Sequence, residues 1–402
     1  MENNKSQIIP INNSLANFER QITIGEKLLG LLNVDIDNLI YEDSQRGASA
    51  RKEWFNSLDD KWKHFLGVEK AQSDTELLQI LRNLTVLDLT EKLIIDLTPL
   101  KDLTKLTHLK LTQNEIFDVT PLTDLIKLTV LDLSENTRHG GIRDLTPLKN
   151  LSNLSDLKLN RLSIIDIAPL KALTNLTALE LEYNRIVDVS PLKGLTNLTK
   201  LSLFNNKIID VSPLKALTSL TELDLSYNNK IGDYSLNQID FAPLKTLINL
   251  TRLCLSNTQI IDIKPLKDLT KLTVLELYNN KIIDVSPLNA FTNLGELRLN
   301  GNKIIDVTPL KALTNLTVLE LEHNRIVDVS PLKELTNLTK LRLSCNQIFD
   351  LTPLKALTNL IMIHLTDDQK IDTSSLRELA KITGLKIYYT ECYSKLFTVT
   401  KF

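Results

Sequence analysis

Five histidines, three cysteines and a regularly recurring aspartate are the side chains of this chain that could do chemistry. Catalysis would need a nucleophile beside a base, a paired acid, or a cluster of metal ligands. The histidines are dispersed, and the motifs G-x-S-x-G, G-x-x-x-x-G-K-S/T and H-E-x-x-H do not occur. We therefore predict that the protein is not an enzyme and holds no metal or cofactor. The histidines are His64, His108, His139, His323 and His364.

The cysteines offer no paired spacing. Cys254, Cys345 and Cys392 are too few and too scattered for a disulfide framework or a metal cluster. We expect all three to be reduced thiols.

The recurring aspartate belongs to a D-x-S/T-P-L motif. A stripe of such carboxylates could be read as a calcium site. Aspartate in a turn, however, hydrogen-bonds its own following backbone, and the strict periodicity of the motif favours an architectural role. The aspartates include Asp188, Asp210, Asp284 and Asp306.

The elements that carry these side chains repeat. The sextet L-x-x-L-x-L occurs fourteen times, and eleven of the thirteen steps between copies are 22 residues. A fixed period of this length is the signature of a stacked repeat protein. The copies start at Leu84, Leu106, Leu128, Leu154, Leu176, Leu198, Leu220, Leu250, Leu272, Leu294, Leu316, Leu338, Leu360 and Ile382.

Each unit contains a short strand, a polar corner and a helical turn. The last four residues of a sextet alternate apolar and polar, which predicts a strand with one buried face. An asparagine follows at a fixed place, and its amide can bond turn backbone groups of neighbouring coils in a ladder. Ser190 or Thr308 can then cap a short helical or 3₁₀ segment, with Pro191 or Pro309 in its first turn. The asparagines are Asn114, Asn136, Asn184, Asn206, Asn280, Asn302, Asn324 and Asn346.

A single coil cannot stand alone. Its roughly seven buried apolar side chains contribute about 10 to 20 kcal/mol, whereas ordering 22 residues of backbone costs roughly 20 to 45 kcal/mol. Neighbouring coils must share one interior, and the tighter spacing of the strands bends the stack with the sheet on the inside.

These motifs resemble leucine-rich repeat proteins of the SDS22-like class, the 22-residue type also found in bacterial internalins. The resemblance implies an α/β right-handed curved solenoid. Its concave parallel sheet would have about 14 short strands, its convex side short 3₁₀ or α segments, and its concave face would bind macromolecules. Departures occur at the asparagine position, and we expect those coils to be looser or terminal. The departing residues are Lys92, Leu162, Thr258 and Asp368.

Three regions are predicted. Residues 1–83 form a helical N-terminal region and cap, 84–387 the solenoid, and 388–402 a C-terminal cap or tail. The N-terminal region carries an apolar stripe at helical spacing that would cover the first coil, although a partner-binding or signalling role is the alternative. The stripe consists of Trp54, Phe55, Leu58, Trp62, Phe65 and Leu66.

Two insertions interrupt the period, at 134–145 and 226–241. Both follow a strand, so we expect them to bulge from the same flank. Long solenoid loops are often binding features, but they are also sites where duplication errors are tolerated.

Function should lie where the architecture leaves the side chain free, on the outward strand columns. Aromatic rings among charges on a sheet can anchor a protein partner. The alternative is an ordinary solvated face. We predict a partner-binding patch that comprises Tyr183, Phe204, Tyr227, Tyr278, Glu180, Glu182, Glu276, Arg298, Glu320 and Arg342.

Two stretches of the sequence are nearly identical, which indicates an internal duplication. Residues 171–201 and 311–341 match at 28 of 31 positions. Part of the surface identity is then inherited rather than selected for a ligand.

Composition limits the partners and the location. The net charge of -2 favours neither nucleic acid nor an anionic bilayer, and 43% hydrophobic residues suffice for a large core. No apolar run approaches 18 residues, and the N-terminal segment does not read as a secretory signal. We expect a monomeric, cytoplasmic scaffold that binds a protein. Three alternatives stay open: a surface or secreted adhesin, a phosphatase regulator, and an enzyme whose chemistry lies in residues 1–83.

Overall fold

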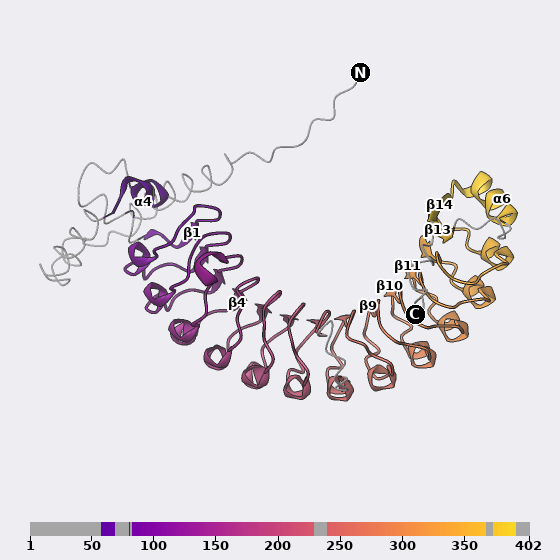
Figure 1. Ribbon diagram of the computed structural model, residues 1–402, viewed down its shortest axis with the longest axis horizontal. Helices are drawn as coiled ribbons and strands as arrows, with labels where there is room; N and C mark the ends of the chain where they lie inside the picture. Colours follow the sequence, from indigo (N-terminus) through magenta and orange to yellow (C-terminus); the bar gives the residue numbers. More distant parts are fainter. Residues whose placement is uncertain (1–57, 69–79, 81–82, 229–238, 367–372, 391–402) are drawn as a thin grey trace, which may run out of the picture.

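The computed structural model describes residues 58–68, 80, 83–228, 239–366 and 373–390. Within these residues, fourteen strands form one curved parallel sheet in which each strand pairs with the next along the chain (Figure 1). The predicted solenoid with about 14 strands is therefore confirmed. The strands are β1 (Val86–Asp88), β2 (His108–Lys110), β3 (Val130–Asp132), β4 (Asp156–Lys158), β5 (Ala178–Glu180), β6 (Lys200–Ser202), β7 (Glu222–Asp224), β8 (Arg252–Cys254), β9 (Val274–Glu276), β10 (Glu296–Arg298), β11 (Val318–Glu320), β12 (Lys340–Arg342), β13 (Met362–Thr366) and β14 (Lys386–Thr390).

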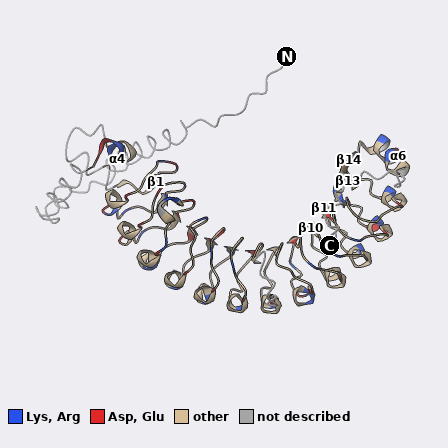
Figure 2. Ribbon diagram, in the orientation of Figure 1, with Lys and Arg blue, Asp and Glu red and all other residues tan. Residues whose placement is uncertain are grey.

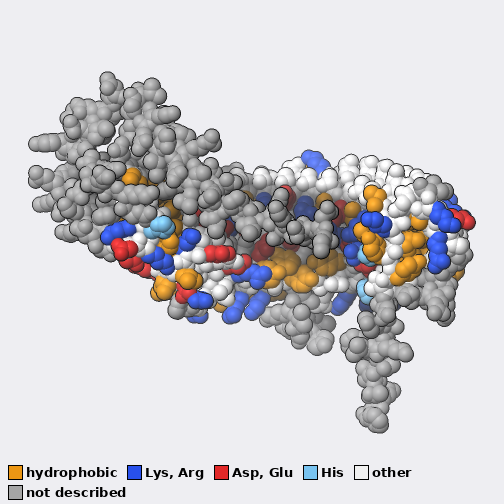
Figure 3. Space-filling model, turned by 90° about the horizontal axis from the view of Figure 1, so that it is seen from above, with side chains coloured by type: hydrophobic (Ala, Val, Ile, Leu, Met, Phe, Trp, Pro, Cys, Tyr) orange, Lys and Arg blue, Asp and Glu red, His pale blue; other side chains and the backbone are white. Residues whose placement is uncertain are grey.

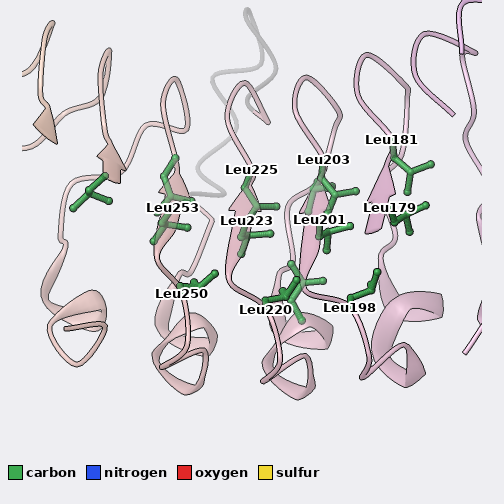
Figure 4. Packing of buried hydrophobic residues seen from close by; sticks show 14 of the residues in the cluster. Leu179, Leu181, Leu198, Leu201, Leu203, Leu220, Leu223, Leu225, Leu250 and Leu253 are labelled. Carbon is green, nitrogen blue, oxygen red and sulfur yellow. The ribbon is translucent and has the colours of Figure 1, made fainter. Parts of the chain in front are cut away.

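The leucine sextets set the register of the sheet. Leu179 in β5 lies opposite Leu201 in β6, which lies opposite Leu223 in β7. A slip of one residue would turn these leucines to the solvent face, so burial fixes the pairing. Figure 4 shows the leucines of successive coils pointing into the space between the strands and the convex segments. They belong to one core cluster that runs from Leu58 to Leu385.

The outer side of the arc is built from 3₁₀ segments. Each unit that contains the D-x-S/T-P-L motif or its close variants forms one, and η3 lies in the first insertion. They are η1 (Thr98–Leu100), η2 (Thr120–Leu122), η3 (Arg138–Gly140), η4 (Thr146–Asn150), η5 (Ala168–Ala172), η6 (Ser190–Gly194), η7 (Ser212–Ala216), η8 (Ala242–Thr246), η9 (Lys264–Leu266), η10 (Ser286–Ala290), η11 (Thr308–Ala312), η12 (Ser330–Glu334) and η13 (Thr352–Ala356).

The capping of these segments differs from the prediction. In η6 the N-cap residue is Val189, which makes no side-chain cap bond. Asp188 Oδ1 instead accepts the backbone N–H of Ser190 at 2.8 Å. Asp188, rather than Ser190, therefore caps the turn, because its carboxylate lies two residues upstream and reaches the backbone N–H of Ser190. Its predicted architectural role is confirmed.

The asparagine ladder is confirmed. Asn206 Nδ2 donates to the carbonyl of Leu181 in the preceding coil at 2.9 Å and to that of Leu203 in its own coil at 3.1 Å. Its Oδ1 accepts the N–H of Ile186 at 3.0 Å. One buried amide thus joins two coils.

Two departures from the ladder do not disturb the sheet. Leu162 is buried, and Thr258 Oγ1 donates to the carbonyl of Leu255 at 2.8 Å, as an asparagine amide would. The strands β4 and β8 of these two coils keep full register with their neighbours, so the loosening we expected is not seen in the strand pairing.

Part of the predicted N-terminal stripe packs against the core of the solenoid. Helix α4 (Asp60–Phe65) begins after Asp59, whose carboxylate accepts the N–H of Trp62 at 2.8 Å. Leu58, Trp62 and Leu66 belong to the core cluster. Trp54 and Phe55 lie outside the described residues.

The last unit is longer than the repeat predicts. Helix α6 (Ser374–Thr383) replaces the 3₁₀ turn, and Ile387 of β14 lies opposite Ile363 of β13. The fourteenth strand therefore lies two residues later than a sextet beginning at Ile382 would place it, because the ten-residue helix contains Ile382 and lengthens the step.

Candidate protein-binding surface on the concave face

The concave face presents regular columns of side chains. We define the central column as the third residue of each strand from β1 to β13, which alternates with the buried leucine before it. Figure 2 shows acidic and basic residues interspersed along the arc. The central column consists of Asp88, Lys110, Asp132, Lys158, Glu180, Ser202, Asp224, Cys254, Glu276, Arg298, Glu320, Arg342 and His364.

The four predicted aromatic residues lie in one row. The ring centroids of Tyr183 and Phe204 are 5.1 Å apart, those of Phe204 and Tyr227 4.9 Å, and those of Tyr227 and Tyr278 6.3 Å. These spacings are typical of stabilising ring pairs. We call these four residues the aromatic row. Figure 3, which looks onto the inner curve, shows hydrophobic side chains beside acidic ones in the middle of the arc.

The backbone conformation of the coil, rather than contacts between the rings, fixes the positions from which Tyr183 and Tyr227 project. Tyr183 and Tyr227 have positive φ angles of 54° and 60°, and non-glycine residues at the equivalent position of most other coils share this conformation. The conformation costs about 1 kcal/mol or more per residue, and backbone hydrogen bonds to the next coil stabilise it. Tyr183 N donates to Phe204 O at 2.9 Å, and Tyr227 N donates to Ser256 O at 2.8 Å.

The rings are less exposed than predicted. Tyr183 is 37% exposed, and the other three rings are half-buried against one another. The Arg161 guanidinium lies over the Tyr183 ring at 3.8 Å from its centroid, a cation–π contact that the sequence interpretation missed. Burial, together with a hydrogen bond to Tyr227, raises the pKa of Tyr278, so its hydroxyl stays protonated.

Charges in the central column alternate in sign at both ends of the arc. Neighbouring members approach as ion pairs: Asp88 with Lys110 at 3.6 Å, and Lys158 with Glu180 at 3.4 Å. Further along, Glu276 pairs with Arg298 at 3.8 Å and Glu320 with Arg342 at 3.5 Å. These pairs compensate most of the charge at each end of the column, although Asp132 forms no ion pair with a described residue.

The predicted charged residues are therefore largely engaged with the protein itself. Glu180 also accepts from Lys200 at 2.8 Å and from Asn160 at 3.1 Å. Glu320, only 7% exposed, also pairs with Lys340. Burial would raise the pKa of Glu320, but the hydrogen bonds from Lys340 and Asn300 outweigh it and lower the pKa.

The alternation breaks in the middle, at Ser202, Asp224 and Cys254. Asp224 accepts the N–H of Ser226 at 2.8 Å, and within the described part of the chain no cationic side chain forms an ion pair with it. Burial raises the pKa of Asp224, and the charges of Glu276 and Glu182 act in the same direction. Burial and the same acidic surroundings raise the pKa of the Cys254 thiol. The sign pattern of the column, visible in the sequence, could have singled out this break.

Other features of the described residues bear on function. No group of three or more metal-ligating side chains occurs in these parts of the chain. None of the helices within the described ranges is long and apolar enough to cross a membrane. Cys254 is a free buried thiol, but Cys345 is disulfide-bonded, which corrects the expectation of three reduced cysteines.

A stack of leucine-lined coils, each supplying one strand to a concave parallel sheet, defines a leucine-rich repeat solenoid. The family model described as leucine-rich repeats in two copies matches residues 196–239, 248–290 and 292–334, and a single leucine-rich repeat matches 334–350. An internalin from Listeria monocytogenes, InlF, is 34% identical over 82% of this chain and 94% of its own, with a TM-score of 0.74. The chain belongs to the leucine-rich repeat family, and an internalin is among its relatives.

More distant structures share the fold alone. The ectodomain of the receptor kinase GASSHO1/SCHENGEN3 from Arabidopsis thaliana is 22% identical, with a TM-score of 0.59 over 79% of this chain and 42% of that one. A TDR receptor is 20% identical, with a TM-score of 0.62 over 79% of this chain and 58% of that one. A search of curated proteins gives no match.

Proposed function

We propose that this protein is a non-enzymatic scaffold that binds a protein partner on the middle of its concave face. The observation that carries the proposal is the aromatic row. Rigid rings that are already packed lose little freedom on binding, and partly exposed rings of this kind are typical of interaction hot spots. Most charged residues at the two ends of the central column are paired within the chain, so they can surround a contact without requiring compensation by the partner.

A double alanine variant tests this proposal. Phe204→Ala with Tyr278→Ala removes two rings of the row, and we expect proteins captured from native lysate by the wild-type chain to be lost. Quantitative mass spectrometry of the captured proteins is the measurement. Full retention of every captured protein by the variant would remove the aromatic row from the function.

The chain offers a matched control. Phe117 and Phe349 are also exposed, but each lies between a buried isoleucine and the capping aspartate, outside the concave columns. Alanine at both positions removes the same kind of ring from a different surface. This control should capture the same proteins as the wild type.

Two cellular locations are candidates for this protein. The sequence favours the cytoplasm. The disulfide of Cys345 and the internalin relative favour an oxidising, extracytoplasmic setting and the adhesin alternative. Fractionation against a cytoplasmic marker decides between them. Recovery of a phosphatase catalytic subunit in the same capture experiment would instead favour the regulatory alternative.

A further inference from the structure

Where it passes the aromatic row, the central column loses its alternation of acids and bases. Between Lys158 and Arg298 the column contains no cation, whereas Glu180, Asp224 and Glu276 all lie in this stretch. Glu180 pairs with Lys200, the first residue of β6, and Glu276 pairs with Arg252, the first residue of β8. Asp224 forms no ion pair with a described residue: Arg252 is close enough to act on it electrostatically, but its guanidinium pairs with Glu276.

Asp224 is a close neighbour of the row. Leu203 N donates to Asp224 O at 2.8 Å, so the residue after Leu203, Phe204, lies beside the strand that ends with Asp224. Glu182 lies on the other side. It accepts the hydroxyl of Ser202 at 2.8 Å, and no ion pair to it occurs within the described ranges. Two acids that form no ion pair with a described residue thus lie in the coils on either side of Phe204.

The protein itself shows which group the row accepts. At one end, the Arg161 guanidinium already stacks on Tyr183. A guanidinium over an aromatic face is stabilised by the ring quadrupole, and a nearby carboxylate adds to the attraction. The next rings along the row have carboxylates beside them but no arginine of this chain above them in the described residues.

We propose that the middle of the aromatic row docks a partner segment that carries an arginine or lysine, with its cation over Phe204 and Tyr227 and against Asp224 and Glu182. The inference rests on the proposed function and specifies the partner chemistry at the same surface. An acidic or purely apolar segment would leave both carboxylates without a counter-charge as it excludes water from them.

Selection from a displayed library of random twelve-residue peptides tests this inference on the full chain. Peptides selected by the wild type should be enriched in arginine and lysine. Selected peptides resynthesised with citrulline in place of arginine should bind about tenfold more weakly. Asp224→Asn should reduce binding of the arginine peptides about tenfold and abolish their advantage over the citrulline forms.

Asp132→Asn is the matched control. Asp132 occupies the same column and accepts the N–H of Ser134 at 2.9 Å, as Asp224 accepts that of Ser226, but it lies between Lys110 and Lys158. Its substitution should leave peptide affinity unchanged. Melting temperatures of both variants show that each is folded.

The outcomes separate the two proposals. Peptides that need Phe204 and Tyr278 but show no preference for arginine over citrulline would overturn the cationic docking and keep the concave function. Peptides whose binding is unaffected by Phe204→Ala with Tyr278→Ala would overturn both. Equal loss of affinity in Asp224→Asn and Asp132→Asn would also reject a specific role for Asp224.

Discussion

Single side chains hold this protein together through bonds between coils. The buried asparagines each serve two coils, and a second set of asparagines on the surface makes a similar but simpler contact. Asn197 Nδ2, for example, donates to the carbonyl of Thr174 in the preceding coil at 2.9 Å. The difference lies in burial, because a buried N–H or carbonyl that loses its partner has no water to replace it.

Alanine at the two kinds of asparagine should therefore have different effects. Asn206→Ala leaves the Ile186 N–H and two buried carbonyls without this partner, and we expect a loss of about 2 to 4 kcal/mol in the free energy of unfolding. Asn197→Ala should cost about 1 kcal/mol or less. Urea unfolding monitored by circular dichroism measures both. Equal losses would show that the ladder is not the stabilising element.

Two acids of the central column should shift stability with pH in opposite directions. The folded state raises the pKa of Asp224, so it binds a proton more tightly than the unfolded chain, and stability falls as pH rises through the interval above the ordinary aspartate value. The folded state lowers the pKa of Glu320, so its contribution is present above the ordinary glutamate value and is lost as pH falls through the lowered one.

We accordingly expect Asp224→Asn to raise the melting temperature at pH 7, with the gain vanishing at acidic pH where the aspartate is protonated in both states. Glu320→Gln should lower the melting temperature at pH 7, and that loss should shrink in acid. Calorimetry of both variants from pH 3 to pH 7 is the measurement. A stabilising Asp224→Asn that weakens peptide binding would mark a residue kept for recognition at the expense of stability.

Adjacent residues in the turn of each coil differ strongly in burial, because their side chains point in opposite directions. Ile208 is fully buried, whereas Ile209 is 55% exposed, although the two are adjacent and chemically identical. The same pair recurs in most units, so the solenoid carries a column of exposed isoleucine and valine after each buried one. Which of the two isoleucines points inward follows from the turn between the asparagine and the aspartate, not from residue type.

Alanine scanning of this pair should reveal the asymmetry. Ile208→Ala should destabilise the protein by about 2 to 5 kcal/mol, because it removes core contacts and leaves a cavity. Ile209→Ala should change stability by about 0.5 kcal/mol or less, as surface substitutions do. Chemical denaturation of the two variants under identical conditions is sufficient, and similar losses would contradict the observed orientation.

The whole molecule is a one-dimensional stack, so stability should spread from coil to coil. Each coil of a solenoid packs mainly on its neighbours. Trp62 of helix α4 and Leu66, the residue after the helix, belong to the same core as the first coil. Loss of a cap should therefore weaken the near end more than the far end.

Hydrogen exchange can show this gradient. Leu66→Ala should increase amide exchange in β1 to β3 and leave β9 to β11 nearly unchanged, because the cavity opens only the N-terminal coils. Leu310→Ala, which truncates a buried side chain of η11, should instead affect β10 to β12. Uniform acceleration along the chain in either variant would indicate that the solenoid unfolds as one unit.

The sequence by itself determined the repeat, the parallel sheet, the asparagine ladder and the architectural aspartates, because a shared interior forces the same residue types into every coil. It also placed Tyr183, Phe204, Tyr227 and Tyr278 near one another, since strand columns follow directly from the 22-residue period. The order of signs along the column is visible in the sequence, but tertiary structure decided which charges form ion pairs, since these pairs join different coils and depend on distance and burial. The stacking of Arg161 on Tyr183 and the lack of an ion pair to Asp224 within the described residues are of this kind. Each depends on where side chains meet across the stack, which a local pattern does not specify.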